Sequence, residues 1–258
     1  MNSRILLPLI LLIVSCNQRK AEEVTSDPSV IPYSVRSSVP HDTHAFTEGL
    51  VIHNGQLYES TGEYGESWIG IVNVNTGMVD KRVILGQEYF GEGITILNNK
   101  LYHLTYKEKT GFVYALNTFK ELKQFNYNTQ GWGLTNDGKN LIMSDGSDKL
   151  FFFDTTNLSI VKTLKVKYKG LPVKNLNELE FIHGFIYSNI WETNTIAKID
   201  MATGEVKGFL DLSRLTKEAK ALNDKIDLLN GIAWDESTKS LFITGKYWPL
   251  LYILTLKE

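Results

Sequence analysis

Apolar and polar residues alternate along most of the chain in short runs, as they do in β-strands that present one face to a core. A pair of such runs, joined by a turn rich in Asn, Asp or Gly, recurs five times: EGLVIHNGQLYES (48–60), EGITILNNKLYHL (92–104), WGLTNDGKNLIMS (132–144), NELEFIHGFIYSN (177–189) and NGIAWDESTKSLFIT (230–244). Further alternating segments follow each copy. A four-stranded unit repeated in this way predicts an all-β, five-bladed β-propeller, because one blade cannot bury both faces without its neighbours.

The last blade lacks an outer strand after LLYILTL (250–256). The stretch Tyr33–Val39 (YSVRSSV) has the missing alternation. We expect it to become the outer strand of the last blade and so to close the ring, which removes an exposed sheet edge. Residues 32–258 then form one propeller domain, with a single helix expected over 213–222 (SRLTKEAKAL).

Residues 1–15 have the features of an export signal. Arg4 precedes the apolar run Ile5–Val14, which is too short to span a bilayer as a stable anchor. The following Ile13-Val14-Ser15-Cys16 resembles a bacterial lipobox, which implies that the Cys16 thiol is diacylated. An ordinary signal peptide with a chance cysteine is the alternative. Residues 16–31 are then a lipidated cysteine and a polar tether, and the protein is exported and held on a membrane, facing the periplasm or exterior, only by lipid.

Charge and cysteine content narrow the functional classes. The 27 Lys and Arg residues nearly balance the 29 Asp and Glu residues, so the concentrated cationic face that nucleic-acid binding requires is not expected. Cys16 is the only cysteine, which excludes an intramolecular disulfide and thiolate metal sites. We expect a monomer.

The repeat also locates a candidate site near the propeller axis. The first residues of the copies are equivalent, and so are the residues fourteen positions later, or sixteen in the fifth copy. Antiparallel pairing brings the start of one strand beside the end of the next, so both sets face one mouth of the channel. They combine carboxyl, amide, ammonium and aromatic groups: Glu48, Glu92, Trp132, Asn177 and Asn230 in the first set, and Gly62, Tyr106, Gly146, Trp191 and Lys246 in the second.

Two interpretations of these positions stay open. The residues differ from blade to blade, whereas structural positions of a repeat stay similar, and this favours a site for an asymmetric small ligand. Alternatively, Tyr106, Trp132 and Trp191 plug the channel, and the polar groups hold water.

Motifs along the whole of residues 32–258 resemble the glutaminyl-peptide cyclotransferases of plant and bacterial type, which are five-bladed propellers. The matching segments are PHDTHAFTEGL (40–50), YFGEGIT (89–95), GWGLTNDGK (131–139), SDG (144–146), LNELE (176–180), NIW (189–191), NGIAWD (230–235) and TGKYWP (244–249). The family often has Gln where this chain has Glu48, and often Trp where it has Tyr106.

The resemblance implies cyclisation of an N-terminal glutamine of a peptide or protein to pyroglutamate, with release of ammonia and without metal or cofactor. It assigns the acid/base role to Glu92. We give Lys246 and Asn177 roles in stabilising the developing oxyanion, as the Trp191 indole could also do. The remaining substrate-binding candidates are Phe46, Glu48, Phe90, Tyr106, Trp132, Trp191 and Asn230.

Two other functions are considered. One is a metal-dependent, lactonase-like propeller hydrolase that binds calcium through Glu48, Glu92, Asn177 and Asn230, although the ammonium of Lys246 would repel a divalent ion. The other is a non-catalytic module that recognises a peptide terminus. His41 and His44 have a spacing that suits a metal, but no third ligand accompanies them, and hydrogen bonding in a loop is expected instead.

Overall fold

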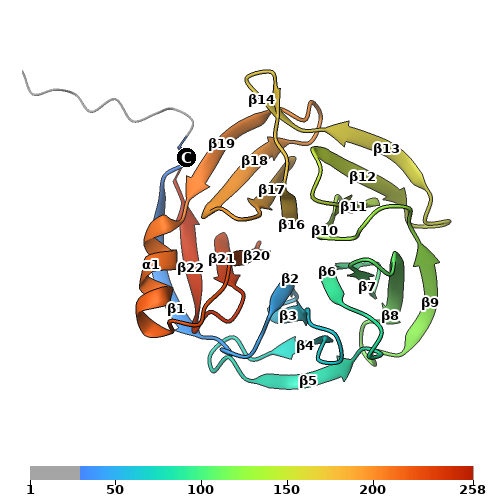
Figure 1. Cartoon of the computed structure of the whole chain (residues 1–258), viewed down its shortest axis with the longest axis horizontal. Coiled ribbons are helices and arrows are strands. Elements are labelled where there is room, and N and C mark those ends of the chain that lie inside the picture. The colour runs from blue at the N-terminus through green and yellow to red at the C-terminus, as the bar shows by residue number, and fades with distance from the viewer. Residues whose placement is uncertain (1–29, 258) are drawn as a thin grey trace, which may run out of the picture.

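Five four-stranded antiparallel sheets are arranged as blades in a ring in the computed structural model, which describes residues 30–257 (Figure 1). The five-bladed propeller expected from the repeats is therefore confirmed. The signal peptide, Cys16 and most of the tether lie outside the described residues, so the structure does not test them.

Each of the first four blades is one continuous stretch of chain, with its first strand innermost. Blades 1 and 2 contain β2 (Thr47–His53), β3 (Gln56–Thr61), β4 (Trp68–Val72) and β5 (Val79–Ile84), then β6 (Gly91–Leu97), β7 (Lys100–Thr105), β8 (Thr110–Ala115) and β9 (Glu121–Asn126). Blades 3 and 4 contain β10 (Leu134–Asn136), β11 (Asn140–Ser144), β12 (Lys149–Asp154) and β13 (Ile160–Lys165), then β16 (Leu176–Ile182), β17 (Phe185–Ile190), β18 (Thr195–Asp200) and β19 (Val206–Asp211).

The fifth blade joins the two ends of the described chain. It consists of β20 (Leu229–Asp235), β21 (Ser240–Gly245), β22 (Leu250–Leu256) and β1 (Tyr33–Pro40). Strand β1 pairs antiparallel with β22 from Tyr33 opposite Leu256 to Pro40 opposite Leu250. This is the ring closure expected from the sequence, and it places the outer strand on a sheet whose other three strands lie about 200 residues later.

The apolar core is divided among the contacts between blades. Ile69 of blade 1 shares a buried cluster with Leu101 of blade 2, and Leu57 of blade 1 shares another with Phe242 of blade 5. Similar clusters lie between the other neighbouring blades. Burial of one large aliphatic or aromatic side chain stabilises the fold by about 1.5–3 kcal/mol. Because each cluster needs two blades, ring closure contributes to the stability of the whole domain.

Four of the five innermost strands contain a β-bulge near their start. The pairing register shifts between Thr47 and Gly49, Gly91 and Ile94, Leu176 and Leu179, and Leu229 and Ile232. A bulge places an extra residue in one strand and redirects its side chains. The residues within these bulges include Glu48, Glu92, Asn177 and Asn230, so the backbone irregularity falls at the predicted site positions.

Two elements lie outside the blades. The helix α1 (Ser213–Leu222) was expected, and it buries Leu215 and Ala219 against the core shared by blades 4 and 5. The small hairpin of β14 (Lys167–Tyr168) and β15 (Leu171–Pro172) has no counterpart among the elements expected from the repeats. Strand β13 ends at Lys165, and Gly170 turns the chain back with φ +82.

Within residues 30–257, no helix has the length and apolar character needed to cross a bilayer.

Candidate active site

A cavity of about 610 Å³ lies where the innermost strands begin. It is lined by two carboxyls and an amide from the bulges, an ammonium, several aromatic rings and a short acidic rim: Phe46, Glu48, Phe90, Glu92, Tyr106, Trp132, Asn177, Trp191, Glu192, Asp227, Leu228 and Lys246. Its volume is typical of sites for small organic ligands. The structure thus brings together all of the predicted site residues except Asn230.

Asn230 lies behind the cavity wall. Its side chain is fully buried, and its Nδ2 donates to Glu48 Oε2 and to the Thr47 carbonyl, both at 3.0 Å. A buried amide that binds two acceptors is a support for those groups. In this structure Asn230 therefore orients Glu48 and does not line the space that a ligand would occupy.

Glu48 and Lys246 form a buried ion pair. Lys246 Nζ lies 2.6 Å from Glu48 Oε1, and the two side chains are 8% and 3% exposed. The same ammonium lies 4.2 Å from the centre of the Phe46 ring. Burial raises the pKa of Glu48 to about 7 against the opposing effect of Lys246. Desolvation lowers the pKa of Lys246, but the carboxyls of Glu48 and Glu92 outweigh it and leave that pKa raised. The pair fixes a cation at one side of the cavity.

Glu92 is a buried carboxyl of the lining without a fixed partner. The residue is 5% exposed, and within residues 30–257 its carboxyl oxygens accept no hydrogen bond and form no ion pair. Burial raises its pKa well above 4.5, and the neighbouring charge of Glu48 raises it further, whereas Lys246 acts in the opposite direction. A carboxyl tuned in this way can exchange protons with an amine near neutral pH.

Aromatic side chains form the walls of the cavity, and two glycines make room for them. The Phe46 and Phe90 rings meet edge to face with centres 6.0 Å apart, and those of Trp132 and Trp191 are 5.7 Å apart. A Cβ at Gly62 would collide with the Phe90 ring, and one at Gly146 would collide with Trp132. The small residues at these repeat positions are thus explained by the rings that pack on them.

Asn177 presents a buried acceptor. It is 4% exposed, and its Oδ1 has no hydrogen-bond partner among the described residues. A buried polar atom without a partner costs about 1–3 kcal/mol. An N–H group of a ligand would remove that cost, so the cavity is suited to a ligand that carries donors.

Glu192, Asp227 and Leu228 were missed by the sequence analysis. Each is near a predicted position: Glu192 follows Trp191, and Asp227 and Leu228 precede the start of the fifth copy. Adjacency to these predicted positions was the sequence signal that could have assigned them to the cavity. Repeat equivalence specifies the first position of each copy and the end of its second run, and it assigns no place to the residues that flank them.

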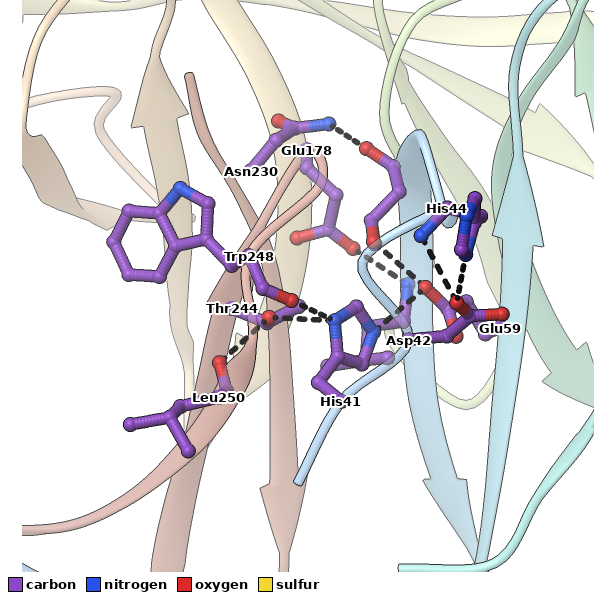
Figure 2. Close-up of polar contacts among 11 residues, drawn as sticks. His41, Asp42, His44, Glu59, Glu178, Asn230, Thr244, Trp248 and Leu250 are labelled. Carbon is purple, nitrogen blue, oxygen red and sulfur yellow. Dashed lines mark hydrogen bonds and ion pairs between the residues drawn. The ribbon is translucent and has the colours of Figure 1, made fainter. Parts of the chain in front are cut away.

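The two histidines of PHDTH have different environments. His41 is buried and hydrogen-bonded to Glu59 and Trp248, whereas the side chain of His44 is 91% exposed and contacts Asp42 (Figure 2). Across residues 30–257, no group of three or more His, Cys, Asp or Glu residues has an arrangement that could hold a metal ion. Hydrogen bonding by these histidines, as expected from the sequence, agrees with the contacts.

Comparison with known proteins identifies the family. The family model described as glutamine cyclotransferase matches residues 6–256. The chain belongs to the glutamine cyclotransferase family. It is thus an enzyme, and the resemblance drawn from the motifs is confirmed. A glutaminyl-peptide cyclotransferase from Arabidopsis thaliana is 40% identical over 227 residues, which cover 87% of this chain and 71% of the relative.

A solved structure shows the same architecture in another member of the family. The crystal structure of Myxococcus xanthus glutaminyl cyclase superposes with a TM-score of 0.84 at 33% sequence identity. The match covers 90% of this chain and 99% of that one. The five-bladed ring is therefore an architecture that this chain shares with another glutaminyl cyclase.

Proposed function

We propose that this enzyme converts the N-terminal glutamine of peptides or proteins to pyroglutamate with release of ammonia, and that Glu92 is its general acid/base. The observation that carries the proposal is the state of Glu92, a buried carboxyl with a raised pKa and no fixed partner on the cavity wall. The membership of the chain in the glutamine cyclotransferase family supports glutaminyl peptides as the substrate class.

The reaction joins the substrate's α-nitrogen to its own γ-carbonyl carbon and breaks the bond from that carbon to the side-chain nitrogen. The α-amine must be neutral to attack, and its ordinary pKa of about 7.7–8.0 leaves a minority neutral at pH 7. Glu92 accepts the proton that the α-nitrogen loses and returns it to the leaving nitrogen, which departs as ammonia. One carboxyl thus serves both steps, and the proton count balances.

Charge that develops on the γ-carbonyl oxygen needs donors. Lys246, whose ammonium is held by Glu48 at 2.6 Å, is the strongest candidate. The indole N–H of Trp191 is free of hydrogen bonds among the described residues and also lines the cavity. Asn177 can donate through its amide nitrogen, and its unpartnered Oδ1 can accept from the substrate amine.

The aromatic walls supply the remaining part of catalysis. Phe90 and Tyr106 pack with ring centres 5.8 Å apart, and Trp132 lies against Trp191 on the other side. Apolar walls favour a folded glutamine side chain over an extended, hydrated one. Folding brings the α-nitrogen to the γ-carbon, and such proximity accounts for a large part of the rate of ring closure.

A mass measurement tests this function. The purified exported form, incubated with a peptide that begins with Gln, should convert it to a product lighter by one ammonia. The same peptide with Asn in place of Gln would require a strained four-membered ring and should remain unchanged. Binding of the Gln peptide without any mass loss would contradict catalysis and would favour a recognition module.

We also propose that the chain is exported and lipid-anchored through Cys16, which rests on the lipobox-like Ile13-Val14-Ser15-Cys16 and the preceding apolar run. The mature wild-type protein should then begin at a diacylated Cys16 and fractionate with membranes. Cys16→Ser should remove the lipid mass and release the protein from the membrane fraction. A wild-type protein cleaved elsewhere, without lipid, would indicate an ordinary signal peptide.

A further inference from the structure

The charges that line the cavity do not cancel. Lys246 is paired with Glu48 in the interior, and Glu92 lines the same buried part of the cavity. The two remaining acidic residues of the lining are Glu192 and Asp227. Both residues are exposed, and within residues 30–257 neither carboxyl has an ion-pair partner or a hydrogen-bond donor. The cavity therefore carries uncompensated negative charge at its solvent side.

Backbone contacts fix the chain at both residues, which lie on neighbouring blades and line the same cavity. Glu192 follows strand β17 of blade 4 in a left-handed conformation with φ 64, within a turn where Thr193 N donates to the Ile190 carbonyl at 3.1 Å. Asp227 precedes β20 of blade 5, and its backbone N–H donates to the Lys246 carbonyl at 2.9 Å. Blades 4 and 5 are neighbours in the ring (Figure 1).

Glu108, which lies near Glu92 and Phe90, differs from Glu192 and Asp227 because its carboxylate accepts hydrogen bonds within the protein. Its carboxylate accepts from the Tyr64 hydroxyl at 2.8 Å and from the Phe90 backbone N–H at 3.4 Å. It is thus engaged in organising an aromatic wall. The carboxyls of Glu192 and Asp227 accept no such hydrogen bonds from the described residues. They line the same cavity as Asn177, whose buried Oδ1 also has no hydrogen-bond donor among these residues.

The size of the cavity and the length of one peptide residue indicate which part of a bound peptide would lie near Glu192 and Asp227. A cavity of about 610 Å³ is in the range of sites that enclose drug-sized molecules, so it has room beyond a single glutamine. Each further residue advances the chain by at most about 3.6 Å. With the N-terminal glutamine beside Glu92, we expect the side chain of the next residue to lie toward the opening of the cavity.

We propose that Glu192 and Asp227 are specificity-determining residues that favour peptides with Lys or Arg directly after the N-terminal glutamine. The inference rests on the proposed function of the same cavity. A cationic side chain is attracted to both carboxylates, and an anionic one is repelled. Interactions of solvent-exposed charges of this kind change kcat/KM by about two- to five-fold each. The two together should separate Gln-Lys from Gln-Glu peptides by about ten-fold.

Three peptides that differ only in their second residue, Lys, Ala or Glu, test the inference. For the wild type, kcat/KM should fall in that order, mainly through KM, and the difference should shrink in about 1 M salt, where the Debye length is about 3 Å. Glu192→Gln and Asp227→Asn should each reduce the Lys-to-Glu ratio, and the double variant should bring it near one. Asp80→Asn is the matched control, since Asp80 is an exposed carboxyl on β5, outside this cavity.

The ratio is independent of the fraction of folded enzyme, so partial misfolding of a variant cannot imitate the effect. Equal kcat/KM for the three peptides in the wild type, or an unchanged ratio in the double variant, would overturn the inference and leave the cyclotransferase reaction intact. Absence of turnover for every Gln peptide would instead contradict the proposed function.

Discussion

His41 Nε2 lies 3.1 Å from Glu59 Oε1 in the buried seam between the first and last blades (Figure 2). The other ring nitrogen, Nδ1, lies 2.9 Å from the Trp248 carbonyl oxygen. Both nitrogens face acceptors, so both carry protons. Thr47 Oγ1 also donates to Glu59 Oε1, at 2.7 Å. The His41 imidazolium thus connects the end of the closing strand β1 to Trp248, two residues after Lys246, and to Glu59. Glu59 in turn binds Thr47, which precedes Glu48.

Replacement of His41 should open this seam. His41→Phe leaves the Glu59 carboxylate buried without its cation, which should lower the free energy of unfolding by about 3–5 kcal/mol. His44→Phe is the matched control, because that side chain is exposed and should change stability little. Thermal unfolding of both variants measures the difference.

The contribution of His41 should depend on pH. Burial lowers its pKa, but the neighbouring Glu59, the hydrogen bond to the Trp248 carbonyl and, more weakly, Asp42 outweigh this effect, so the folded-state pKa is above 6.5. The stabilisation is then complete below about pH 6.5 and is lost as pH rises through the folded-state pKa. A stability gap between wild type and His41→Phe that grew with alkalinity would contradict this assignment.

Glu92→Gln should reduce turnover of a Gln peptide by roughly 10²–10⁴-fold, because it keeps the shape of the side chain and removes its proton transfer. The melting temperature should change little, since the Glu92 carboxyl forms no hydrogen bond or ion pair within residues 30–257. Rates and melting curves are measured on the same preparations. Wild-type turnover in this variant would show that the proton transfer belongs to another group.

Glu48→Gln should keep most of the activity and shift its pH dependence. The charge of Glu48 raises the pKa of Glu92, so its removal lowers that pKa. Glu92 must be ionised to accept a proton, and the acidic limb of the kcat profile should therefore move to lower pH. A pH profile from acid to alkaline pH provides the measurement. An inactive Glu48→Gln beside an active Glu92→Gln would reverse the two roles.

Deletion of residues 32–40 should lower thermal stability sharply, because it removes β1 and leaves the β22 edge without its partner. It also shortens the chain before His41 and disturbs the buried seam. Deletion of residues 17–28, which precede the described chain, should leave stability unchanged. Comparison of the two melting temperatures is the test, and equal values would contradict the contribution of ring closure.

The sequence by itself determined the ring and the place of its site. Strand alternation is a local property, and a unit that recurs five times fixes equivalent positions without knowledge of the contacts between blades. Glu48, Glu92 and Asn177 could therefore be assigned to one cavity, and Tyr33–Val39 to the closing strand, before any distance was known. These expectations agree with the lining of the cavity and with the pairing of β1.

Tertiary structure alone decided which of these groups act as partners. Glu48 binds Lys246, 198 residues away, and Asn230 turned out to support Glu48 from behind the wall. Repeat equivalence specifies a position on a strand, but a side chain's partner depends on bulge geometry and on the packing of the next blade. The position of the exposed Asp227 in the cavity lining could not be predicted from the repeat either. Asp227 lies in a loop that flanks a repeat, and the closed ring places such loops, whereas strand periodicity does not.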